Sequence, residues 1–209
     1  MALEKNFFRQ VMSQFATGVA VVTASNEGTL AGLTVNAFCS VSLEPLLVLI
    51  CVDLSSSALF HIRASGAFAI NVLTSQQEQL SRCFASHSRE RYEEFCHVSY
   101  HIVATGAPIL DNVLAFIDVK VAAEYPGGDH AIFLGQVEAM GAKGLVAFTG
   151  KANRLSRTLS GHDQTVLGDH TGPLIYFCGD YRHLAGSHRE PSLAVVSTNR
   201  DGDYERPAR

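Results

Sequence analysis

The chain lacks the long apolar segments that mark membrane proteins. Its longest apolar run, residues 46–52, has the length of a strand, whereas a membrane-spanning helix needs roughly 20 residues. The first residues also lack the basic stretch and apolar run of a signal peptide. We therefore expect neither a membrane partner nor export, and we predict a cytoplasmic protein.

Charged residues are scarce, at 17% of 209 residues, and the formal net charge is -4. A nucleic-acid-binding protein needs a basic patch, so no nucleic-acid partner is expected. Hydrophobic residues make up 47% of the chain, which is enough to bury a substantial core. Length and composition together predict one globular domain.

Two nucleotide-binding fingerprints are also missing. The chain contains no Gly-x-Gly-x-x-Gly motif and no Gly-x-x-x-x-Gly-Lys-Ser/Thr motif. A nicotinamide dinucleotide would therefore not bind in a Rossmann crossover.

Cysteines and histidines offer little metal or redox chemistry. The five cysteines are odd in number, widely spaced and without a Cys-x-x-Cys pair, so neither a disulfide framework nor a thiol-redox motif is expected. The best metal cluster among the nine histidines is Cys96-His97 with His101. Residues 97–103 alternate like a strand, however, which would place the two histidines two pleats apart. No third ligand is evident nearby, and no metal site is predicted.

The patterns that are present predict a mainly β protein. Apolar periodicity predicts a helix over 4–15 and strands over 19–24, 30–42, 46–52, 67–73, 113–124, 131–140 and 174–178. Further helices are expected over 55–64 and from a capping box at 75–78. Residues 86–95 are charged and irregular, which predicts a short helix and a loop at the surface. Strands without regular β-α alternation favour a barrel with peripheral helices.

Residues 32–45 form the most informative stretch, because small and polar side chains replace the branched hydrocarbons of a plain core strand. Its polar members fall at even positions and would share one face of an extended chain: Thr34, Asn36, Ser40 and Ser42. The apolar members between them would face a core: Val35, Cys39, Val41 and Leu43. The polar face suits the edge of a flat heteroaromatic ligand, or it belongs to an edge strand that faces water.

The segment 53–57 leaves a predicted strand and enters a predicted helix with three consecutive serines. Backbone N–H groups and hydroxyls at a helix start favour an anion, so this segment is a candidate phosphate site. The alternative is that the serines are ordinary helix caps. Arg82, Arg89 or Arg91 could add positive charge there, and the sequence does not choose among them.

Seven segments in order resemble the flavin reductase-like family over roughly residues 7–181. They are residues 15–23, 32–45, 46–57, 68–73, 84–85, 128–130 and 179–181. The resemblance implies an FMN-binding split β-barrel with peripheral helices. By this resemblance the flavin-contacting residues are Thr34, Asn36, Ala37, Ser40, Val41, Ser42, Cys51, Val52, Asp53, Ser55, Ser57, Asn71, Phe84, Ala85 and Tyr181.

His130 follows Gly128-Asp129 and matches a family histidine that lines the nicotinamide side, so it is the expected catalytic residue. A turn histidine at the start of a strand is the plainer interpretation. Tyr181 matches the family's closing Gly-x-Tyr, and it either walls the pocket or belongs to the core.

The implied activity is an NAD(P)H-dependent flavin reductase that passes hydride from NADH or NADPH to FMN or FAD. The resemblance also implies a two-fold dimer and a partner flavin-dependent monooxygenase that uses the reduced flavin. Two alternatives stay open: a flavin- or haem-binding module without turnover, and a reductase of a non-flavin substrate that uses flavin as a relay.

The expected domain spans residues 1–181, with an insertion at 141–172. Residues 182–209 form a polar C-terminal extension that we expect to be partly disordered.

Overall fold

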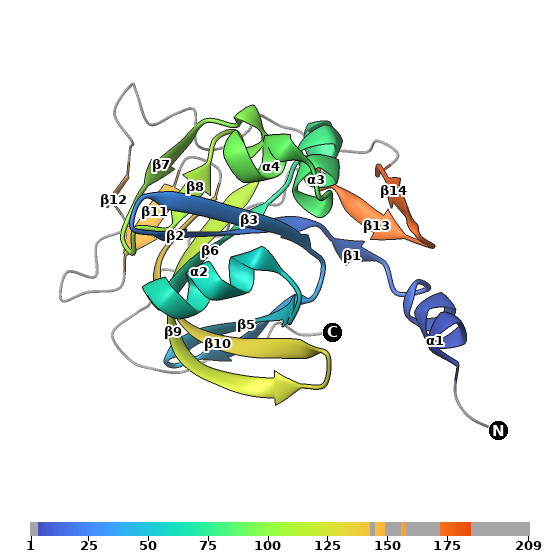
Figure 1. Cartoon of the computed structure of the whole chain (residues 1–209). Helices are drawn as coiled ribbons and strands as arrows, with labels where there is room; N and C mark the ends of the chain where they lie inside the picture. Colours follow the sequence, from blue (N-terminus) through green and yellow to red (C-terminus); the bar gives the residue numbers. More distant parts are fainter. Residues whose placement is uncertain (1–3, 143–144, 149–155, 158–171, 185–209) are drawn as a thin grey trace, which may run out of the picture.

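Figure 1 shows the computed structural model of the chain, which describes residues 4–142, 145–148, 156–157 and 172–184. Most of the predicted 141–172 insertion and the 182–209 extension lie outside these residues. The helices are α1 (Lys5–Met12), α2 (Ser57–Ser65), α3 (Glu78–Ala85) and α4 (Arg89–Glu93), with 3₁₀ turns at Ser75–Gln77 and Phe95–His97. The strands are β1 (Thr17–Gly18), β2 (Ala20–Asn26), β3 (Thr29–Val35), β4 (Phe38–Leu43), β5 (Leu46–Asp53), β6 (Ala67–Val72), β7 (Tyr100–Ile102), β8 (Pro108–Leu110), β9 (Ala115–Gly127), β10 (His130–Ala142), β11 (Leu145–Phe148), β12 (Ser156–Arg157), β13 (Ile175–Phe177) and β14 (Asp180–Arg182).

The predicted mainly β architecture is confirmed. An antiparallel sheet runs in the order β12-β11-β10-β9-β6-β2-β3 and branches at β10, which also pairs with β5, and β5 in turn pairs with β4. Within the described ranges β3 and β4 share no ladder, so the sheet curls without closing, as in a split barrel. Figure 1 shows β3 running between α2 on one side and α3 and α4 on the other.

Alternation along the long strands fills the core. On β10 the buried side chains are at odd positions, including Ala131, Phe133 and Val137, while even positions face outward. Helix α2 turns Leu59 and Ile62 into the same core cluster. A second cluster lies under α3 and includes Phe84.

The predicted hairpin of residues 19–42 is only half right. Strands β2 and β3 pair as expected, but β3 ends at Val35 and Asn36-Ala37 interrupt the chain before β4 begins. The register of β4 against β5 also shifts between Ser40 and Ser42, so Val41 is an extra, bulged residue. The single strand expected over 30–42 is therefore wrong.

The helical predictions are confirmed with small shifts. Helix α2 begins two residues later than expected and is followed by Gly66 as predicted. The capping box lies one residue earlier than predicted, with Thr74 and Gln77 as its partners. The hairpin partner β14 of the last predicted strand was not expected. Among the described helices, none is long and apolar enough to cross a membrane.

The expectation that the cysteines form no disulfide is wrong, because Cys83 of α3 is bonded to Cys96. The spacing of the cysteines in the sequence did not indicate this pair, because the two residues are 13 positions apart and meet only where the chain reverses direction. The bond closes a loop that contains α4, and Phe95, Cys96 and His97 all have left-handed backbone conformations at its end. Arg91 in this loop is buried, although a solvated surface segment was expected. In the described part of the chain, no three potential metal ligands cluster.

Helix α1 projects from the body of the molecule at the N-terminal end (Figure 1). Its predicted apolar stripe exists, but every residue of the helix is exposed, and Phe8 and the following Phe15 are 64% and 71% exposed. The apolar face therefore finds no cover within the described residues of one chain.

Candidate functional site

The first group of predicted site residues meets on the outer face of β4, β5 and β10. His130 is opposite Asp53 in the register of β10 with β5, and Ile132 is opposite Cys51. Since directly opposed residues point to the same side of a sheet, Cys51, Asp53 and His130 share one face. The Cys51 N–H donates to the Ala37 carbonyl at 3.0 Å, which brings the segment between β3 and β4 to the same place.

A second group meets where β3, α3 and β14 converge. The Thr34 hydroxyl donates to the Ser81 carbonyl at 2.6 Å, and the hydroxyls of Ser81 and Tyr181 are hydrogen-bonded at 2.7 Å. The Arg82 guanidinium lies 4.7 Å from the centre of the Tyr181 ring. Exposed Asn36 and Ala37 follow Thr34 in the chain, so they connect this group to Cys51.

The shared polar face expected for residues 34–42 does not form. The bulge at Val41 reverses the alternation, so Ser40 lies opposite Val48, Ser42 lies opposite Leu47, and the two serines no longer share a face. Ser42 accepts a hydrogen bond from the Glu44 N–H. The apolar residues expected in the core, Val41 and Leu43, are instead exposed, Leu43 by 83%.

Three of the predicted flavin contacts have buried side chains. Asn71 is fully buried, donates to the Val21 carbonyl and the Thr23 hydroxyl, and accepts from the Leu110 N–H. Val52 turns its side chain into the core opposite Ala131. Phe84 of α3 is fully buried as well. In this structure these side chains pack against other parts of the chain, and the sequence pattern could not distinguish such packing from contact with a ligand.

Phe84 packs edge-on against Phe95, with ring centres 5.2 Å apart. A Cβ at Gly32 would collide with the Phe84 ring, so the glycine allows β3 to approach α3 closely. The next residue, Ala85, is exposed at the end of α3. Of the predicted contacts Phe84 and Ala85, only Ala85 has a side chain that a ligand can reach.

The serine segment is less open to an anion than expected. The Asp53 carboxylate accepts hydrogen bonds from the Ser55 N–H at 2.7 Å and the Ser55 hydroxyl at 2.6 Å. The Ser56 N–H donates to the Asp53 carbonyl. The bonds from Ser55 lower the pKa of Asp53, and the nearby charge of His130 adds to that effect. Ser55 is therefore committed to Asp53, which leaves Ser57 as the serine that lines a cavity.

His130 begins β10 directly after a tight turn, in which Gly128 has φ +76°. Its Nδ1 lies 2.7 Å from a carboxylate oxygen of Asp129, and this hydrogen bond lowers the pKa of Asp129. The side chain is 41% exposed. It borders an open cavity of about 330 Å³. Arg63 and Glu124 also line this cavity and form an ion pair, with 2.6 Å between Nη2 and Oε1.

The turn of His130 is joined to the serine segment, since the Leu54 N–H donates to the Asp129 carbonyl at 3.0 Å. Two loops that are far apart in sequence are thus held at one edge of the barrel.

A smaller cavity of about 90 Å³ lies between α2, β3 and α4. Ser57 and His61 line it from α2, residues 29–32 from β3, and Arg91 and Tyr92 from α4. Arg91 is 6% exposed, and it donates from Nε to the Gly32 carbonyl at 3.0 Å and from Nη1 to the Ser86 carbonyl at 2.7 Å. Burial lowers the pKa of Arg91 from its usual value, although a guanidinium remains charged in proteins.

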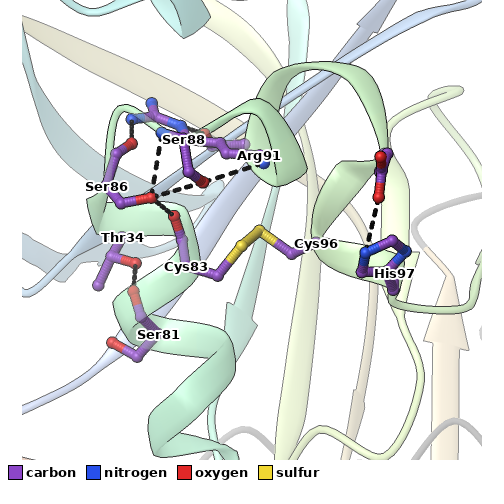
Figure 2. The surroundings of a disulfide bond; sticks show 10 residues. Thr34, Ser81, Cys83, Ser86, Ser88, Arg91, Cys96 and His97 are labelled. Atoms are coloured by element: carbon purple, nitrogen blue, oxygen red, sulfur yellow. Dashed lines mark hydrogen bonds and ion pairs between the residues drawn. A yellow bond between two sulfur atoms is a disulfide. The ribbon is translucent and has the colours of Figure 1, made fainter.

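The tertiary structure therefore separates the three candidate arginines. Arg82 is paired with Glu78 beside Tyr181, Arg89 is exposed and paired with Glu93, and Arg91 lies across the cavity from Ser57. Figure 2 shows Arg91 with Ser86 and Ser88 above the Cys83–Cys96 bond. Sequence reasoning missed His61 and Tyr92 in this cavity, and no motif marks them.

Comparisons with known proteins give a consistent result. A family model described as a flavin reductase like domain matches residues 12–185. The reductase subunit HsaB of a flavin-dependent monooxygenase from Mycobacterium tuberculosis (strain ATCC 25618 / H37Rv) is 36% identical over 138 residues, which are 66% of this chain and 72% of that protein. The NADH-dependent FMN reductase AsuE2 of Streptomyces nodosus subsp. asukaensis is 39% identical over 140 residues, which are 64% and 72%.

Solved structures agree with the fold. Flavin reductase PheA2 in its native state superposes with a TM-score of 0.70 at 30% identity, covering 88% of this chain and all of that one, 100%. BorF, the flavin reductase component of a bacterial two-component tryptophan halogenase, gives 0.70 at 27% identity, with 88% and 100% covered.

Proposed function

This chain belongs to the flavin reductase-like family, and from that premise we propose that it is an NAD(P)H-dependent flavin reductase. The observation that carries the proposal is the convergence of predicted site residues from distant segments: Thr34 with Tyr181, Ala37 with Cys51, and Asp53 with His130. Flavin, when bound, accepts hydride from the nicotinamide, and the protein supplies binding, orientation and access.

We place the flavin ring against Asn36, Ala37 and Cys51, where backbone and side-chain polar groups are exposed at the gap between β3 and β4. The phosphate then lies in the smaller cavity between Ser57 and Arg91. Gly32 lines this cavity, and Asn36 lies where we place the ring. The two residues are four positions apart, or about 13 Å along an extended chain, which is a suitable length for the ribityl phosphate between them.

The donor set of this cavity fits a phosphate. Arg91 supplies a buried positive charge, and its Nη2 group has no hydrogen-bond partner among the described residues. Ser57 lines the same cavity as the first residue of α2, next to the N-cap residue Ser56, whose hydroxyl does not cap the helix. Phosphate oxygens provide acceptors for such donors at a helix start.

In this reaction His130 binds and orients the nicotinamide. Asp129 holds Nδ1, which leaves Nε2 as the ring nitrogen for a hydrogen bond to the carboxamide. The open cavity beside His130 gives the second substrate access without displacing the flavin phosphate. We therefore keep His130 as the catalytic residue.

The homodimer is also proposed. The uncovered apolar residues of α1 and of β4 point to a second copy of the chain, since exposed apolar surface of this extent favours association. The largest exposed members are Phe7, Phe8, Val11, Met12, Phe15, Val41 and Leu43. A sedimentation mass of 22.5 kDa at micromolar concentration would contradict a stable dimer.

We further propose that the reduced flavin is delivered to a separate flavin-dependent monooxygenase. The support is that similar proteins are named as reductase subunits or components of such systems. The primary test mixes the purified chain with FMN or FAD and with NADH or NADPH, and follows nicotinamide absorbance. Flavin-dependent oxidation of either nicotinamide cofactor is expected. Tight flavin retention without turnover would instead favour a non-catalytic flavin-binding module.

A further inference from the structure

His61 takes part in the smaller cavity in a way that its role in helix packing does not explain. Ser57 and His61 are four residues apart on α2, so they share one face of the helix, and both line the cavity opposite Arg91. The Nδ1 atom of His61 is buried and has no hydrogen-bond partner among the described residues. A buried ring nitrogen without a partner is costly, so packing of the helix alone does not explain this histidine.

The charge around the cavity defines that ligand as an anion. Arg91 and Tyr92 face it from α4, Ser57 and His61 face it from α2, and the β3 segment of residues 29–32 brings no ionisable side chain. Among the residues that the structure describes, no carboxylate lines the cavity. A buried guanidinium and an unpartnered imidazole on opposite walls suit a phosphate, which accepts hydrogen bonds from both.

We propose that His61 is a phosphate-binding residue that, together with Arg91 and Ser57, selects phosphorylated flavins over riboflavin. This inference rests on the proposed function and adds a residue that the family motifs do not mark. An imidazole N–H donates a hydrogen bond to a phosphate oxygen, and the negative charge of the phosphate strengthens that bond.

The test measures the dissociation constants of FMN and riboflavin, by quenching of flavin fluorescence, for the wild-type chain and two variants. His61→Gln should weaken FMN binding by about tenfold at pH 6.5 and leave riboflavin binding within about twofold, because one charge-assisted hydrogen bond is lost. His97→Gln is the matched control, since His97 is an exposed histidine paired with Glu94. It should change neither value.

A third variant separates a phosphate ligand from a packing residue. An arginine at this position still donates hydrogen bonds to a phosphate but does not have the shape of an imidazole. His61→Arg should therefore keep the preference for FMN over riboflavin that His61→Gln loses.

Equal weakening of FMN and riboflavin by His61→Gln, or unchanged FMN binding, would overturn the proposal for His61. Failure of the wild-type chain to bind any flavin would instead sink the proposed function. In that case inorganic phosphate is the probe: thermal stabilisation of the wild type by phosphate, reduced in His61→Gln, would still support the anion site. Absence of that stabilisation would reject it.

Discussion

The cavity of Ser57, His61 and Arg91 and the turn of His130 are two parts of the proposed flavin site that the protein holds differently. Arg91 is buried, tied to two carbonyl oxygens and enclosed in a disulfide-closed loop. His130 is 41% exposed and has one side-chain hydrogen bond, to Asp129 on the same turn. The proposed phosphate site is therefore built into the fold, whereas the proposed nicotinamide site at His130 is left accessible.

This difference suits a reductase that must hold one substrate while another enters and leaves. A buried guanidinium is costly to desolvate, so it persists only where its hydrogen bonds are satisfied. An exposed histidine contributes little to folding, and it remains free to contact an incoming cofactor. Changes at Arg91 should therefore affect stability and flavin binding together, while changes at the His130 turn should affect mainly the reaction with NADH and have little effect on stability.

The largest effect is expected for Arg91→Leu. Loss of two hydrogen bonds from a charged group, with the Gly32 carbonyl left buried and the Ser86 carbonyl left half-buried, should lower the free energy of unfolding by roughly 3–6 kcal/mol. Urea unfolding measures this change. The matched control is Arg89→Ala, which removes an exposed ion pair and should cost less than about 1 kcal/mol. Equal losses in the two variants would contradict the assigned difference in burial.

The next effect concerns the Cys83–Cys96 bond. A loop of this length restricts the unfolded chain by about 3 kcal/mol in the entropic model, so Cys83→Ala should lower stability by an amount of that order. FMN affinity should fall as well, because the loop carries Arg91. Cys178→Ala, at an exposed free thiol, is the control. If a thiol count without reductant finds five free cysteines, the disulfide itself is refuted.

A smaller effect is expected at the reacting end. His130→Ala should raise the KM for NADH or lower turnover by a few-fold to about tenfold, since one positioned hydrogen bond to an uncharged group is lost. Flavin affinity should stay nearly unchanged. Ser57→Ala should do the reverse, weakening FMN binding with little effect at saturating flavin. Unchanged NADH kinetics in the His130 variant would reduce this residue to a turn histidine.

The smallest effect is expected from Asp129→Asn. The pKa of Asp129 is lowered in the folded protein, chiefly by the hydrogen bond from His130, so its contribution to stability is present above the unfolded pKa of about 3.9. That contribution is lost as the pH falls through the lower folded value. Thermal midpoints of variant and wild type should therefore differ slightly at pH 6 and converge near pH 2. Divergence at low pH would contradict the assignment.

Much of the fold could be predicted because its signals are local. The period of apolar residues marked β2, β5, β6, β9, β10 and α2 within a few residues of their observed bounds. The order of short motifs indicated the family. The predicted face of residues 34–42 failed at two places: the chain leaves the sheet at Asn36-Ala37, and the extra residue Val41 reverses the side of every residue that follows it.

The sequence by itself determined which segments become strands and helices, where His130 stands at the start of β10, and which chemical family the chain belongs to. Only the tertiary structure decided that Arg91 and not Arg82 or Arg89 lies across from Ser57, that Asn71 is enclosed, that Ser55 is occupied by Asp53, and that Cys83 meets Cys96. Periodicity reports the environment of one segment at a time. Such pairings depend on how segments that are tens of residues apart pack together, and no pattern within a single segment specifies its packing partner.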